Sequence, residues 1–111
     1  MRDPVTDAFG PGAIRHHFAG GVYAKETRIP RDGFVVSHAH PYDHMSILAS
    51  GVATIIIEDQ ARPLYGPAVV MIKAGQEHRI NAISDIVWFC IHATEETDPA
   101  KVNDVILQRE A

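Results

Sequence analysis

Between residues 22 and 93, short apolar or alternating runs follow one another and are separated by residues that favour turns. The runs cover 22–29, 34–40, 45–49, 52–58, 61–65, 68–72, 78–83 and 86–93. Each break contains glycine, proline, aspartate or serine, as in Ser50-Gly51 and Gly66-Pro67. Short runs at a spacing of roughly 8–12 residues are typical of an all-β sandwich or barrel. We therefore predict an all-β protein.

The two ends of the chain lack this pattern. Residues 1–21 are rich in glycine and include prolines, and we interpret them as an N-terminal arm that is ordered only if it packs on the body of the protein or on a partner. Near the other end, Asp98-Pro99 resembles a helix N-cap followed by proline, so we expect a short helix or turn over 100–104. A closing strand is expected over 105–107. The predicted organisation is an arm over 1–21, one barrel domain over 22–94 and a tail over 95–111.

The composition narrows the class of protein. The chain has 111 residues, 46% of them hydrophobic, which is enough for one modest core. The net charge is -4 and no basic run occurs, which argues against a nucleic-acid partner. No apolar run approaches the roughly 18 residues of a membrane span, and no apolar signal segment begins the chain. We therefore expect no membrane partner and a cytoplasmic location. The single Cys90 excludes an internal disulfide and is interpreted as a small buried apolar residue.

The distribution of the seven histidines is the most distinctive feature of the chain. His38, His40 and His44 fall within one short segment, and His78 follows the later sequence Gly75-Gln-Glu. Imidazole is the commonest metal ligand in proteins. We therefore predict that these four histidines bind a metal ion.

Strand geometry suggests how the first three histidines meet. Residues i and i+2 of a strand share a face, so His38 and His40 should project together. We expect that face to be the inward one, because Phe34 and Val36 share it. His44 opens the next strand and is expected to face His38 and His40 across the strand pair. A closed barrel would then bring them together with the fourth histidine.

These residues resemble the two motifs of the cupin superfamily. The first motif, G-x5-H-x-H-x3,4-E-x6-G, is matched by Gly33, His38, His40, His44 and Gly51. The second motif, G-x5-P-x-G-x2-H-x3-N, is matched by Gly75 and His78, with Gly66 and Asn81 nearby. The resemblance covers about residues 22–93. It implies a cupin double-stranded β-helix, a jelly-roll-like β-barrel, with one divalent transition metal (Fe, Mn, Ni, Cu or Zn) on His38, His40, His44 and His78.

The chain departs from the cupin motifs at informative positions. The first Gly-to-His gap is one residue short, Lys73 replaces the usual proline, and Asn81 comes one position early. Above all, His44 replaces the usual glutamate. A neutral imidazole leaves the centre one positive charge higher, which favours anionic, bidentate oxygen ligands such as enolates or carboxylates. Alternatively, His44 stays unbound and leaves a three-histidine site.

The resemblance implies a metal-dependent enzyme, and we expect a dioxygenase-like oxidoreductase acting on a small oxygenated organic molecule. Two alternatives remain: a non-catalytic module that binds a metal or small ligand, and a metal-dependent sugar isomerase or epimerase. The expected partners are a small-molecule ligand or substrate and a second copy of the chain, since cupins are commonly dimers.

Other candidate residues receive structural interpretations. The segment from His38 to His44 also resembles the H-x-H-x-D-H signature of the metallo-β-lactamase fold, but it has one residue too many and the chain is too short for that fold. Asp43 is therefore interpreted as a turn residue. We expect ordinary strand positions for Tyr23 and Lys25 and a turn position for Tyr42. His16 and His17 are expected in the arm, and Glu77 at an exposed position. His92 shares the parity of Trp88 and Cys90, but we place it outside the metal site.

Overall fold

The computed structural model describes residues 14–37, 42–94 and 98. It contains nine strands: β1 (Ile14–Ala19), β2 (Val22–Ile29), β3 (Phe34–Ser37), β4 (His44–Ser50), β5 (Val52–Ile57), β6 (Gln60–Tyr65), β7 (Ala68–Ile72), β8 (His78–Ala82) and β9 (Ile86–Ala93). They form one sheet in the order β1-β2-β9-β4-β7 and another in the order β3-β8-β5-β6. All neighbouring strands are antiparallel. The described residues include no helix long and apolar enough to cross a membrane.

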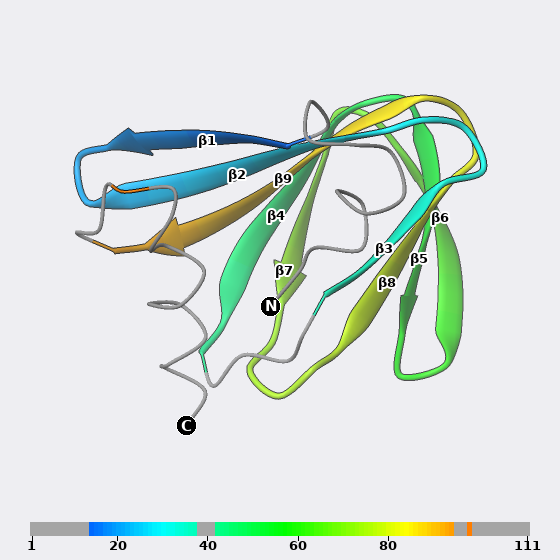
Figure 1. Ribbon diagram of the computed structural model, residues 1–111. Coiled ribbons are helices and arrows are strands. Elements are labelled where there is room, and N and C mark those ends of the chain that lie inside the picture. The colour runs from blue at the N-terminus through cyan, green and yellow to red at the C-terminus, as the bar shows by residue number, and fades with distance from the viewer. Residues whose placement is uncertain (1–13, 38–41, 95–97, 99–111) are drawn as a thin grey trace.

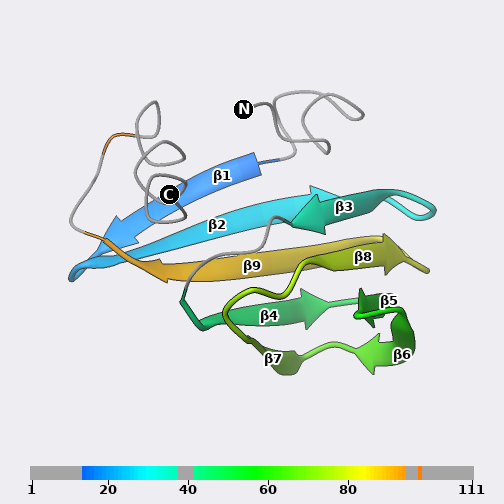
Figure 2. The ribbon, with the colours of Figure 1, turned by 90° about the horizontal axis from the view of Figure 1, so that it is seen from below.

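The two sheets lie face to face, as Figures 1 and 2 show. In Figure 1 they converge near the β4–β5 connection and diverge toward the end at which β3 stops and β4 and β8 begin. The all-β prediction is therefore confirmed, and so is the double-stranded jelly-roll arrangement.

The eight predicted runs correspond to eight of the strands. The bounds of β2, β7 and β9 agree with the prediction, and most other strands differ by one residue at an end. The predicted run over 34–40 corresponds to β3, whose described part ends at Ser37. The predicted helix over 100–104 and the strand over 105–107 lie outside the described residues.

Strand β1 was not predicted, and it lies within the residues assigned to the arm. It pairs with β2 along its whole length, from Ile14 opposite Thr27 to Ala19 opposite Val22. Gly20 and Gly21 form the turn, with φ angles of +57° and +75°. Two consecutive residues with positive φ match the twist of a tight hairpin, and glycine adopts them without strain. The described part of the arm, residues 14–21, therefore packs on the body of the protein through this hairpin.

The core lies between the sheets and follows strand parity. Its buried members are Ile29, Val35, Leu48, Ala53, Ile55, Leu64, Val70, Ile72, Ile80, Ala82, Ile86 and Trp88. Each fully buried aliphatic side chain of this kind contributes about 1.5–3 kcal/mol relative to an exposed one. Cys90 is only partly buried, although it packs against this core as expected of a small apolar residue. The Oγ–H of Ser46 donates a hydrogen bond of 3.8 Å to the sulfur of Cys90.

Candidate metal centre

A row of aromatic and imidazole side chains crosses the inner face of the five-stranded sheet at its diverging end. Tyr23 of β2 pairs in register with His92 of β9, and their rings are stacked with centroids 6.0 Å apart. His92 is stacked in turn on His44 of β4, with centroids 5.1 Å apart. The row brings residues from both halves of the sequence to one end of the barrel.

His78 faces this row from the opposite sheet. It is the first residue of β8, and its ring centroid lies 6.1 Å from that of His44. The side chains of both histidines are shielded, since His44 is 5% exposed and His78 is 1% exposed. The structure thus brings together two of the four predicted ligands, which are 34 residues apart in the sequence.

The spacing of these two rings lies within the upper limit for two imidazoles that share one metal ion. A metal lies about 2.1 Å from a bound imidazole nitrogen and thus about 3.2 Å from the ring centre, so two rings on one ion have centres no more than about 6.4 Å apart. The observed 6.1 Å meets this limit. The described residues contain no group of three or more His, Cys, Asp or Glu side chains arranged to hold an ion. Any centre built on His44 and His78 therefore depends on donors from elsewhere.

His38 and His40 lie outside the described residues. The end of β3 nevertheless lies beside the candidate metal centre, because Ser37, the residue before His38, pairs in register with His78. The expectation that β3 and β4 form a strand pair is wrong, since β3 belongs to the four-stranded sheet and β4 to the five-stranded one. His44 accordingly faces β8 and β3 across the barrel and not along a ladder.

The predicted inward face of β3 is also wrong. Val35 is 9% exposed and belongs to the core, whereas Phe34 is 40% exposed on the other face. The guanidinium carbon of Arg79 lies 4.3 Å from the centre of the Phe34 ring, an attractive cation–π contact on the outer surface. The parity of Phe34 and Val36 therefore gives no support for an inward orientation of His38 and His40.

The loops that precede His44 and His78 are joined to each other. The backbone N–H of Ala74 donates to Oδ1 of Asp43 over 2.8 Å. The backbone N–H of Lys73 donates to the Gln76 side chain over 3.1 Å, which closes the loop before β8. Asp43 thus links the segments that carry the two histidines.

His92 also lies in this cluster, although it is not one of the four predicted ligands. It is 4% exposed, and its Nδ1 shares a hydrogen bond of 3.0 Å with the Tyr42 hydroxyl. The alternation along β9 indicates that His92 is buried, because Ile86 and Trp88, which share its face, are also buried.

Trp88 lies on the other side of His78. It is 1% exposed, and its ring centroid is 6.2 Å from that of His78. Among the described residues, its Nε1–H finds no hydrogen-bond acceptor. A buried donor without an acceptor costs about 1–3 kcal/mol, so this N–H is suited to an oxygen of a bound molecule.

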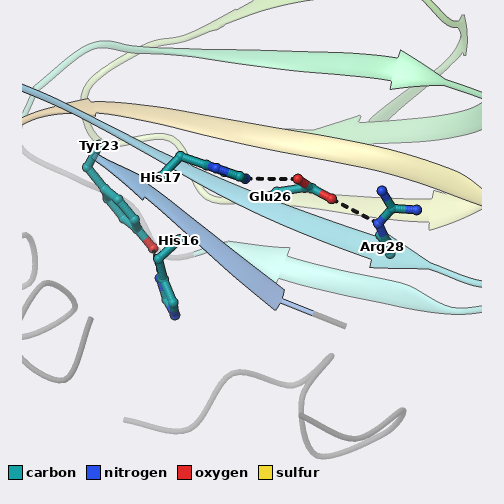
Figure 3. Close-up of polar contacts among 5 residues, drawn as sticks. All are labelled: His16, His17, Tyr23, Glu26 and Arg28. Atoms are coloured by element: carbon teal, nitrogen blue, oxygen red, sulfur yellow. Dashed lines mark hydrogen bonds and ion pairs between the residues drawn. The ribbon is translucent and has the colours of Figure 1, made fainter. Parts of the chain in front are cut away.

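A second polar cluster lies on the opposite face of the β1–β2 hairpin, as Figure 3 shows. Glu26 accepts hydrogen bonds of 2.9 Å from Nε2 of His17 and of 2.9 Å from Nε of Arg28. The His17 hydrogen bond, followed by the hydrogen bond and positive charge of Arg28, lowers the pKa of Glu26 against the opposing effect of burial. On the inner face of the same hairpin, His16 shares a hydrogen bond of 2.7 Å with the Tyr23 hydroxyl. The Glu26 cluster is therefore separate from the metal centre.

No family model matches the sequence, and no curated protein matches it. Solved structures do match the fold. A cupin 2 domain-containing protein from Halorhodospira halophila is 16% identical and superposes with a TM-score of 0.67, covering 85% of this chain and 75% of that chain. The chain has the cupin fold. A cupin 2 conserved barrel domain protein from Salinispora arenicola is 14% identical, with a TM-score of 0.64 over 86% of this chain and 82% of that chain. A cupin superfamily protein from Desulfitobacterium hafniense is 18% identical, with a TM-score of 0.62 over 74% and 78% of the two chains.

Proposed function

We propose that this cupin binds one divalent transition metal through His38, His40, His44 and His78. The observation that carries the proposal is the pair of buried imidazoles from opposite sheets, His44 and His78, with ring centres 6.1 Å apart. Such burial disfavours water as a competing ligand.

We further propose that the metal-loaded protein is a dioxygenase-like oxidoreductase acting on a small oxygenated organic molecule. A bound divalent ion of this kind supplies Lewis acidity and, if it is redox-active, electrons for reaction with O₂. The role of the protein is to hold the ion and orient the substrate. The buried Nε1–H of Trp88 beside His78 supports an oxygen-rich substrate, because it supplies a donor inside the barrel.

Oxygen uptake tests the catalytic part of this proposal. Protein loaded anaerobically with Fe(II) or Mn(II) should consume O₂ when a suitable β-diketone, enol or hydroxy acid is added. A His78→Ala variant treated in the same way serves as the control and should consume none above background. No O₂ uptake across a broad panel of such molecules would contradict a dioxygenase activity and leave metal binding to be tested separately.

A specific observation favours a second function, that of a non-catalytic binding module. Among the described residues Glu26 is the only buried carboxylate, and it points to the outer face of the β1–β2 hairpin. The described interior therefore offers no carboxylate for proton transfer. Stabilisation by a metal and a small carboxylate, with no conversion of the carboxylate, would support this function. Conversion of a sugar without O₂ would instead indicate an isomerase or epimerase.

A further inference from the structure

Tyr42, His92 and His44 form a closed set of contacts at the candidate metal centre. The Tyr42 hydroxyl and Nδ1 of His92 share a hydrogen bond of 3.0 Å, whose donor depends on the tautomer of His92. The rings of His92 and His44 are stacked, with 5.1 Å between centroids and 23° between planes. The Tyr42 ring meets both imidazoles edge-on, 6.4 Å from His44 and 6.0 Å from His92.

We propose that Tyr42 and His92 are positioning residues that hold the His44 ring in its metal-binding orientation. This inference rests on the proposed function, because it assumes that His44 is a ligand. We do not assign His92 as a further ligand, because its Nδ1 shares a hydrogen bond with the Tyr42 hydroxyl and its ring is stacked face to face on that of His44.

The contacts explain how the pair acts on His44. Pairing of β4 with β7, in which His44 lies opposite Ile72, fixes the backbone of His44. It does not fix the rotation of the ring, because the terminal torsion of histidine is broad. The His92 ring covers one side of His44, the Tyr42 ring meets it edge-on, and the Tyr42–His92 hydrogen bond keeps His92 in place.

The energetic consequence is measurable as metal affinity. Groups that orient a ligand without touching the metal typically cost 10–100-fold in metal affinity when they are removed. Tyr42→Phe removes only the hydroxyl, and His92→Phe keeps an aromatic ring but removes the hydrogen bond. If the two residues act as one unit, the double variant should lose little more affinity than His92→Phe alone.

Titration with Co(II) tests the proposal, with affinity measured by competition against a chelating dye and the ligand field by the visible spectrum. We expect Tyr42→Phe and His92→Phe to bind Co(II) 10–100-fold more weakly and to show displaced absorption bands. The matched controls are His16→Phe, which breaks a similar imidazole–tyrosine hydrogen bond one strand further away, and Tyr65→Phe, which removes an exposed hydroxyl. Both controls should retain the wild-type affinity and spectrum. Circular dichroism of each metal-free variant checks that it is folded.

The outcomes distinguish this inference from the proposed function. Wild-type affinity and spectrum in Tyr42→Phe and His92→Phe, together with lost binding in His44→Ala and His78→Ala, would overturn the positioning role alone. The electron paramagnetic resonance spectrum of the Cu(II)-loaded protein gives a second check. Fewer coordinated nitrogens in His92→Phe than in the wild type would also overturn the positioning role, because His92 would then be a ligand. A wild-type protein that does not bind Co(II) would refute the proposed metal site itself.

Discussion

Replacement of Gly51 by alanine tests how closely two turns approach each other at the end of the fold opposite the candidate metal centre. Gly51 has a φ of +92°, in the region that L side chains rarely adopt. A Cβ atom there would lie 2.3 Å from the carbonyl oxygen of Asp85, 2.7 Å from Cγ2 of Ile86 and 2.9 Å from Oγ of Ser84. The turn between β4 and β5 therefore approaches the turn between β8 and β9 too closely for any side chain.

Two costs combine in Gly51→Ala. The left-handed backbone costs about 1–2 kcal/mol for a non-glycine residue. Overpacking against a backbone oxygen costs a further ~1–3 kcal/mol, because neither turn can move without disturbing its strands. We expect a total loss of about 2–5 kcal/mol, a large part of the ~5–15 kcal/mol that stabilises a domain of this size.

Urea unfolding of the metal-free proteins, followed by circular dichroism, measures this loss. Gly20→Ala is the matched control, because Gly20 has a φ of +57° but no atom within 4 Å of its Cβ position. It should lose only the backbone cost of about 1–2 kcal/mol. Equal losses in the two variants would refute the argument from close approach, since backbone strain alone would then account for both.

Three further predictions follow from other parts of the molecule. Because the pKa of Glu26 is lowered in the folded protein, its carboxylate stabilises the fold above the unfolded pKa of about 4.3, and this contribution is lost as the pH falls through the lowered value. Glu26→Gln should therefore lower the free energy of unfolding by about 1 kcal/mol at pH 7 and by progressively less below about pH 4. Glu77→Gln, on an exposed loop, is the control and should lower it little at any pH. A loss in Glu26→Gln that does not change with pH in urea unfolding would contradict this. The homodimer expected from the sequence stays a prediction, and Val69 and Met71, which are 63% and 52% exposed on the outer face of β7, give it a testable contact surface. Light scattering should show a dimer that Met71→Glu weakens, and a monomeric wild type would contradict the prediction. Zn(II) at a hundredfold excess over its Kd should stabilise the protein by about 2.7 kcal/mol, measured by thermal unfolding, and an equal gain in His78→Ala would argue against the site.

Local patterns in the sequence were sufficient to predict most of the strands. The runs that became β2 and β7 are bounded by turn residues on both sides, and the run that became β9 begins directly after Ser84-Asp85. Strand β1 was not predicted, because His16 and His17 interrupt any apolar alternation along it. Its stability comes from pairing with β2 and from the contact of His16 with Tyr23, which no local pattern reveals.

The candidate site was predicted less completely, because its members meet through long-range packing. Motif spacing identified His44 and His78, and the structure brings them together. The parity prediction failed on β3, because Val35 faces the core and Phe34 contacts Arg79 on the outer face. The contacts of His92 could not be predicted, because His44 and Tyr42, its neighbours in the fold, lie far from it in the sequence.

Trp88 permits the most direct test of the central claim, that His44 and His78 hold a metal ion inside the barrel. It is the only tryptophan of the chain, and its ring centroid lies 6.2 Å from that of His78. An open-shell ion such as Ni(II) bound at His78 should quench the fluorescence of this indole. Titration of Ni(II) into metal-free protein should therefore give saturable quenching at one ion per chain, unchanged in His17→Ala and lost in His44→Ala and His78→Ala. Absence of saturable quenching in the wild type, or equal quenching in the His44 and His78 variants, would contradict the account.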